Sequence, residues 1–99
     1  MTEPSVVTVT AQTVARLARG VRLREDEVRG QTVLLAPERA LALDEVAVMI
    51  VKALDGERDL DAIAQEFSIK FEASKVQILT DVIAFVDEFS KRRMLELKS

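Results

Sequence analysis

The segment ALALDEVAVMIVKALDG, residues 40–56, places the strongest constraint on what this chain can fold into. After Asp44 it has only two charged residues over ten positions, so a helix here is apolar nearly all round and must be buried on most sides. The Asp44 carboxylate can accept the free N–H groups of the first turn, and Gly56 can supply a left-handed stop. We therefore predict a central helix over Asp44–Leu54, held between the elements before and after it.

Three short strands are predicted before this helix. Apolar and charged residues alternate over Val21–Arg24, the period of a half-buried strand, and Gln31–Leu35 is rich in β-branched and apolar residues. Turn residues fill positions 26–30 and 36–38, and a third strand, Arg39–Leu43, runs directly into the central helix. A three-stranded antiparallel meander of this size must lay one face on helices to be stable.

Two helices are predicted after Gly56. Asp59 is a candidate N-cap for the first, in which apolar residues recur at i, i+3, i+4 and i+7 before Ser68–Phe71 breaks the pattern. Ser74 is a candidate cap for a longer helix that reaches about Arg93. The predicted class is α+β, with three strands and then three helices over residues 16–97, and residues 1–15 as a flexible tail or a linker remnant.

The last helix carries more apolar surface than a helix with a single neighbour needs. Two adjacent stripes cover about 180° of its circumference, against ~100° for a helix packed on one neighbour. One stripe can pack on the central helix, and the other is either buried within the domain or lines a groove. The stripes are Val76, Leu79, Ile83 and Val86, and Ile78, Val82, Phe85 and Phe89.

An edge strand beside an apolar helix face can receive an extended peptide as an additional strand. The third strand is one edge of the meander, and it enters the central helix directly. We predict a peptide-binding site in which this strand supplies the backbone and one stripe of the last helix supplies the opposite wall. Its predicted residues are Arg39, Ala40, Leu41, Ala42, Leu43, Lys75, Leu79, Ile83 and Val86.

Composition argues against several other functions. The chain has no Cys, His, Tyr or Trp, which removes the commonest general base and the thiolate nucleophile, so we expect neither catalysis nor a metal or cofactor. The net charge is −3, and no segment has the one-sided basic face that phosphate binding requires. The longest apolar runs are too short to cross a bilayer, and no secretion signal is present at the start, so a cytoplasmic protein is expected.

The segment from Gly20 to Leu95 resembles the pyrroloquinoline quinone biosynthesis protein D family. The resemblance depends on the order and spacing of Arg-Gly before the second strand, Ala-Pro-Glu, Leu-Asp-Glu, and Asp-Gly at positions 55–56. It implies a winged-helix-like domain of the kind called a RiPP recognition element. It also implies two partners: a short ribosomal precursor peptide (protein A), and the radical S-adenosylmethionine enzyme (protein E) that cross-links a Glu and a Tyr within it.

Two other classes remain open from the residues alone. A winged-helix domain can bind nucleic acid, although the first half of the last helix offers a single base, Lys75, and also carries Asp81. An exposed edge also allows self-association, so a monomer or a weak homodimer is expected.

Overall fold

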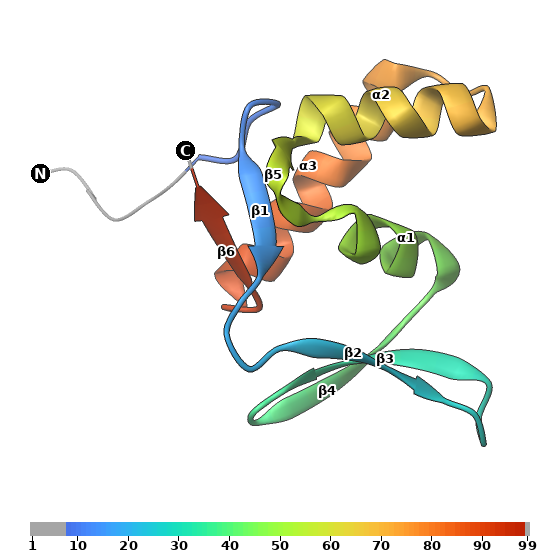
Figure 1. Ribbon diagram of the computed structural model, residues 1–99, viewed down its shortest axis with the longest axis vertical. Coiled ribbons are helices and arrows are strands. Elements are labelled where there is room, and N and C mark those ends of the chain that lie inside the picture. The colour runs from blue at the N-terminus through green and yellow to red at the C-terminus, as the bar shows by residue number, and fades with distance from the viewer. Residues whose placement is uncertain (1–7, 99) are drawn as a thin grey trace, which may run out of the picture.

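The computed structural model describes residues 8–98, which form six strands, three helices and two separate sheets (Figure 1). The elements, in chain order, are β1 Val14–Leu17, β2 Arg22–Asp26, β3 Gln31–Ala36, β4 Arg39–Leu43, α1 Glu45–Ala53, β5 Asp55–Asp59, α2 Leu60–Phe71, α3 Lys75–Lys91 and β6 Leu95–Lys98. The α+β class is confirmed.

The predicted meander is present as the sheet β2-β3-β4, called here the second sheet. Leu23, Leu34 and Leu41 lie opposite one another across its three strands, and Leu34 is fully buried. The alternation in the sequence therefore indicates which face is inward. Gly30 closes the β2-β3 turn with a φ of +66°, a conformation that glycine adopts without a steric cost.

A first sheet, in the order β5-β1-β6, was not predicted. Its central strand, β1, pairs antiparallel with β5 on one side and with β6 on the other. The β5 sequence, Asp-Gly-Glu-Arg-Asp, has low intrinsic strand propensity, and its partner lies about forty residues earlier in the chain. Only the tertiary arrangement makes this segment a strand.

The predicted flexible tail over residues 1–15 is wrong for its second half. Val9, Thr13 and Ala15 are buried, and β1 begins at Val14. The Thr13 hydroxyl accepts a hydrogen bond from the Thr10 N–H at 2.9 Å, which closes a turn just before the strand. The segment is ordered because β1 has a strand on each side of it. Residues 1–7, where the tail was also predicted, lie outside the described residues.

The helix caps agree with the sequence, but some of the predicted ends do not. The side chains of Asp44, Asp59 and Ser74 accept hydrogen bonds from the first turns of α1, α2 and α3. α2 continues to Phe71 without the predicted break, and α3 ends at Lys91. Leu54 ends α1 in an extended conformation, so the positive φ of Gly56 belongs to β5 and not to a helix stop.

The hydrophobic core consists of two adjoining clusters. The first lies between the first sheet and the three helices, and the second lies under the second sheet against Val51 of α1 and Met94. Phe85, Phe89 and Leu17 pack against both clusters and so join the two parts of the molecule. α1 is less buried than predicted, because Val46 remains 58% exposed on the side away from this core.

Candidate functional site

The backbone edge of β4 is open. β4 pairs with β3 from Thr32↔Leu43 to Ala36↔Arg39, and no other described strand pairs with it. β1, which could have occupied this edge, lies instead in the first sheet. An unpaired strand edge presents N–H and C=O groups that an extended peptide can satisfy.

The side chains of β4 divide between the two faces of the second sheet. Leu41 and Leu43 point inward and pack against the second cluster, which includes the buried Leu34. Ala40 and Ala42 are exposed on the outer face. A peptide strand added beside β4 would follow the same alternation, with every second side chain directed toward the helices.

An apolar groove of about 320 Å³ lies between the three helices on the side of α1 that the core leaves uncovered. Phe67 and Phe71 meet edge to face across one helical turn, with ring centroids 6.0 Å apart. Asp81 is the single charged residue of the lining. The groove residues are Val46, Met49, Ile50, Phe67, Phe71, Ala73, Ile78, Asp81 and Val82.

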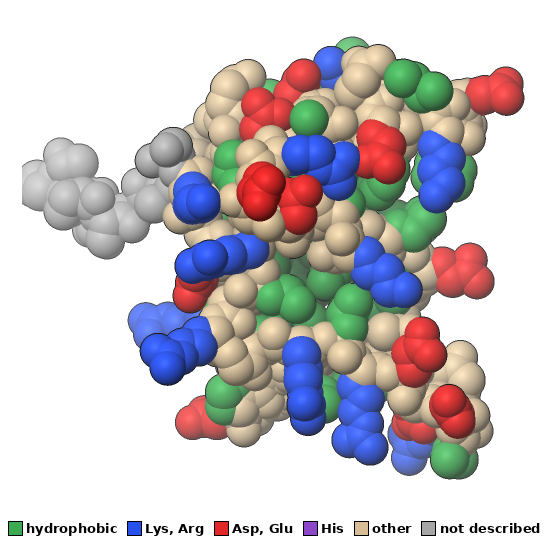
Figure 2. Space-filling model, viewed as in Figure 1, with side chains coloured by type: hydrophobic (Ala, Val, Ile, Leu, Met, Phe, Trp, Pro, Cys, Tyr) green, Lys and Arg blue, Asp and Glu red, His purple; other side chains and the backbone are tan. Residues whose placement is uncertain are grey.

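This groove continues toward β4. A second hollow lies between the end of the second sheet and α1, lined among others by Thr32, Leu43 and Met49. Met49 belongs to both linings, so it connects the end of β4 with the apolar groove. Figure 2 shows hydrophobic side chains at the bottom of a hollow between the second sheet, in the lower part of the view, and the elements above it.

The predicted helix wall is not brought together with β4. Val86 is fully buried in the first cluster, so its assignment to a peptide-contacting wall is wrong in this structure. Leu79 and Ile83 also pack against the first cluster, whereas Leu41 of β4 packs against the second. Lys75, expected to be free for an acidic peptide residue, forms an ion pair with Asp61 at 3.0 Å.

The other stripe of α3 supplies the groove and the support for β4. Ile78 and Val82 line the groove, and Phe85 and Phe89 stack at 4.2 Å between centroids against the second cluster. Val82 is itself buried, so each stripe has members in the core. A helical-wheel projection of the sequence could not tell which stripe faces the groove, because that depends on where α1 and the sheets lie.

None of the nine groove residues was among the predicted site residues, and three of them, Val46, Met49 and Phe71, show why. The signal for the first two was present, since a short helix that is apolar all round has more apolar surface than the core of a small domain covers. Phe71 was assigned to a break between helices, which hid its place in the last turn of α2.

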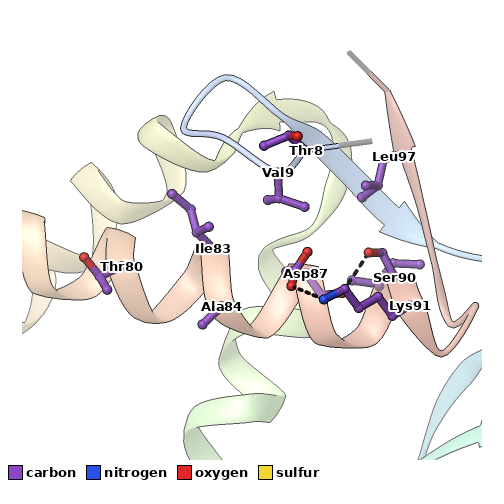
Figure 3. A pocket seen from close by; sticks show the side chains of 10 residues that line it. Thr8, Val9, Thr80, Ile83, Ala84, Asp87, Ser90, Lys91 and Leu97 are labelled. Carbon is purple, nitrogen blue, oxygen red and sulfur yellow. Dashed lines mark hydrogen bonds and ion pairs between the residues drawn. The ribbon is translucent and has the colours of Figure 1, made fainter. Parts of the chain in front are cut away.

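A separate groove of about 850 Å³ lies along α3 beside the N-terminal end of the described chain (Figure 3). Ile83 and Leu97 contribute apolar surface, and Asp87 and Lys91 form an ion pair at 3.1 Å on its rim. Val9 forms the wall opposite α3. Ile83 therefore lines a groove to which β4 contributes no residue.

Perturbed titratable groups lie away from the groove. Backbone N–H groups of Arg58 and Glu57 lower the pKa of Asp55 to about 2, and the carboxylate of Glu66 raises the pKa of Arg58. These residues connect β5 to α2 and have a structural role. In the described range no cluster of three metal-ligating side chains occurs, and no helix there is long and apolar enough to span a membrane.

The fold and the site define a class: a small α+β domain with a free strand edge that leads into an apolar groove. Comparison with known proteins gives the family. Residues 31–95 match the model of the family described as coenzyme PQQ synthesis protein D (PqqD), and the chain belongs to that family.

Relatives and solved structures agree with this assignment. The chain is 62% identical over 89 residues to the PqqA binding protein of Rhizobium meliloti (strain 1021), covering 90% of this chain and 91% of the relative. The solution NMR structure of the PqqD truncation of Methylobacterium extorquens PqqCD, described as a RiPP recognition element, matches with a TM-score of 0.78 and 41% identity over 89% of this chain and 94% of that chain. The crystal structure of PqqD from Xanthomonas campestris matches with a TM-score of 0.57 and 41% identity, over 81% and 89% of the two chains.

Proposed function

We propose that this protein binds the precursor peptide of pyrroloquinoline quinone biosynthesis, PqqA, and holds it for the enzyme that modifies it. The observation that carries the proposal is the free edge of β4 beside a groove that is apolar except for Asp81. The relatives named PqqA binding protein and the structure described as a RiPP recognition element support the same function.

In this proposal the peptide adds as a strand to Arg39–Leu43. Its backbone pairs with β4, and an apolar side chain near one end enters the groove between Val46, Met49 and Phe71. Ordering a disordered peptide costs ~2–5 kcal/mol, so the affinity is modest and the complex can release the peptide after modification.

The protein acts as an adaptor and not as a catalyst. Its partners are the peptide and, by resemblance to the family, a radical S-adenosylmethionine enzyme. The sequence supports this role because it has no His, the commonest general base, and no Cys, the thiolate nucleophile.

Isotope-labelled protein titrated with synthetic PqqA tests the site. The largest amide shift changes are expected in Arg39–Leu43 and around Val46 and Phe71. Val46→Asp places a carboxylate in the apolar groove at an exposed position, so the peptide affinity falls at least tenfold while the unfolding midpoint changes little.

Val76→Asp is the matched control, because Val76 is 77% exposed and is absent from the groove lining. Equal affinities of Val46→Asp and the control, or shift changes centred on the opposite edge strand β2, would contradict the proposed site.

A further inference from the structure

The outer face of the second sheet carries an organised set of side chains that the peptide site does not use. In the strand register Arg22, Leu35 and Ala40 lie opposite one another, and so do Arg24, Val33 and Ala42. We call these six residues the outer face. Four of them are exposed, and the two apolar residues of the central strand, β3, are half-buried.

No described element covers the outer face. The inner face packs on the second core cluster through the alternate residues, among them Leu34, whereas the outer residues belong to neither cluster. Val33 and Leu35 form an apolar centre, and the two alanines on β4 have side chains short enough to let another surface approach the backbone closely. The face therefore has an apolar centre on β3, a basic border on β2 and a border of small alanine side chains on β4, next to the open edge.

The two arginines on this face have no ionic partner. In the described chain, ion pairs join Arg16, Arg58, Lys75, Lys91 and Arg92 to carboxylates, and none involves positions 18–54. Arg22 and Arg24 thus present free guanidinium groups in a protein whose net charge is −3. Figure 2 shows Lys and Arg side chains side by side over the lower part of the molecule, where this sheet lies.

The sign of the surface charge also changes along the strands of this sheet. Glu25, Asp26 and Glu27 lie at the β2-β3 hairpin, beside Arg24, and line the adjoining hollow. The face is therefore basic along β2 and acidic at the hairpin end. A partner with charges complementary to both regions can bind in only one orientation. A uniformly charged surface would not fix the orientation of its partner.

We infer that the outer face is the docking surface for the enzyme that modifies the bound peptide, and that this enzyme presents carboxylates around an apolar patch to Arg22 and Arg24. The inference rests on the proposed function. A peptide strand beside β4 would continue the same sheet, so its alternate side chains would join the outer face next to Ala40 and Ala42. The enzyme would then contact adaptor and peptide on one continuous surface.

The test uses the full chain, the radical S-adenosylmethionine enzyme and synthetic PqqA. Arg22→Glu together with Arg24→Glu should weaken binding to the enzyme at least tenfold at low ionic strength, and added salt should reduce the difference from wild type. Peptide affinity should stay within twofold of wild type, because neither side chain lies at the β4 edge. Arg22→Lys with Arg24→Lys should restore most of the enzyme binding.

The matched control is Lys52→Glu with Arg93→Glu, which makes the same change of charge at exposed positions without ion pairs. If the double glutamate variant alters the circular dichroism spectrum, Arg22→Ala with Arg24→Ala is used in its place, because it removes the charges without adding repulsion. The inference is overturned if the control and the outer-face variants lower the enzyme affinity equally. It is also overturned if neither of them lowers it.

Two further results would also overturn it. Loss of peptide binding by the folded outer-face variant would place the peptide, not the enzyme, on this face. A change in sedimentation of the variant without enzyme would make a second copy of this chain the occupant. If wild type binds no peptide, the proposed function fails, whereas the enzyme titration without peptide still reports on the outer face.

Discussion

At the scale of single residues, the clearest determinants are the side chains that begin helices. The Asp44 carboxylate accepts a hydrogen bond from the Ala47 N–H at 2.8 Å, directly between the edge strand and the helix that forms part of the groove. This cap fixes where β4 ends and α1 begins. It therefore contributes to the geometry of the site as well as to stability.

Replacing Asp44 with Ala should lower the free energy of unfolding by about 1 kcal/mol, because the first turn of α1 loses its side-chain acceptor. Urea unfolding followed by circular dichroism measures the change. Asp44→Ser is the control that keeps a capping oxygen and should retain most of the stability. Equal losses in the two variants would show that the cap is not the cause.

Asp55 gives a prediction about acid stability. Its pKa is about 2 in the folded protein because the N–H groups of Arg58 and Glu57 donate to the carboxylate, against an ordinary value of 3.8. A carboxyl whose pKa is depressed by folding stabilises above its unfolded pKa and loses this effect as the pH falls through the folded value.

Wild-type stability should therefore fall between about pH 4 and pH 2 by more than that of Asp55→Asn, which does not titrate. Thermal unfolding midpoints at pH 5 and at pH 2.5, measured for both proteins, check this. Equal decreases of the unfolding midpoint in wild type and Asp55→Asn would mean that other carboxylates determine the acid sensitivity.

At the scale of elements, α3 has three packing roles along one helix. Val86 and its neighbours hold the first sheet and α2 together, whereas Ile78 and Val82 reach the groove, and Phe85 and Phe89 support the second sheet. Of the first stripe, Val86 is fully buried in this core, and Ile83 lines the separate groove beside Val9. The accessible wall is instead made jointly by three helices, with α1 contributing as much as α3.

Val86→Asp should lose the helical circular dichroism signal at 25 °C. Burying an unpaired carboxylate costs several kcal/mol, a large part of the ~5–15 kcal/mol that a domain has in total. Val76→Asp, on the same helix at an exposed position, should fold normally. A folded Val86→Asp that fails to bind the peptide would restore the first stripe as a peptide wall.

At the scale of the whole molecule, the two sheets depend on each other through shared aromatic residues. The first sheet and the second sheet have different buried clusters, but Phe85 and Phe89 belong to the packing of both. Because neither sheet can bury its inner face alone, the domain should unfold in one cooperative transition.

Leu34→Ala and Ile63→Ala remove fully buried side chains, one from each cluster, and each should cost ~2–5 kcal/mol. Both variants should shift the same single transition in calorimetry, with equal midpoints for calorimetry and circular dichroism. A separate early transition in Leu34→Ala alone would show that the second sheet unfolds as an independent unit.

The features that the sequence alone determined are local. The strand meander, the three helix caps and the position of β4 at an edge follow from alternation, turn residues and capping side chains within a few positions of one another. The family resemblance added the expected winged-helix-like form and the expected peptide, and the family assignment is confirmed.

The tertiary structure decided what depends on distant segments. Asp55–Asp59 became a strand, and residues 8–13 became part of the folded domain, only because β1 lies between β5 and β6. Which residues of the two α3 stripes lie in the core and which line the groove was decided in the same way, since an apolar helix face becomes core or groove according to which elements pack on it. Local patterns carry no information on that choice, because its energy comes from contacts between residues far apart in the chain.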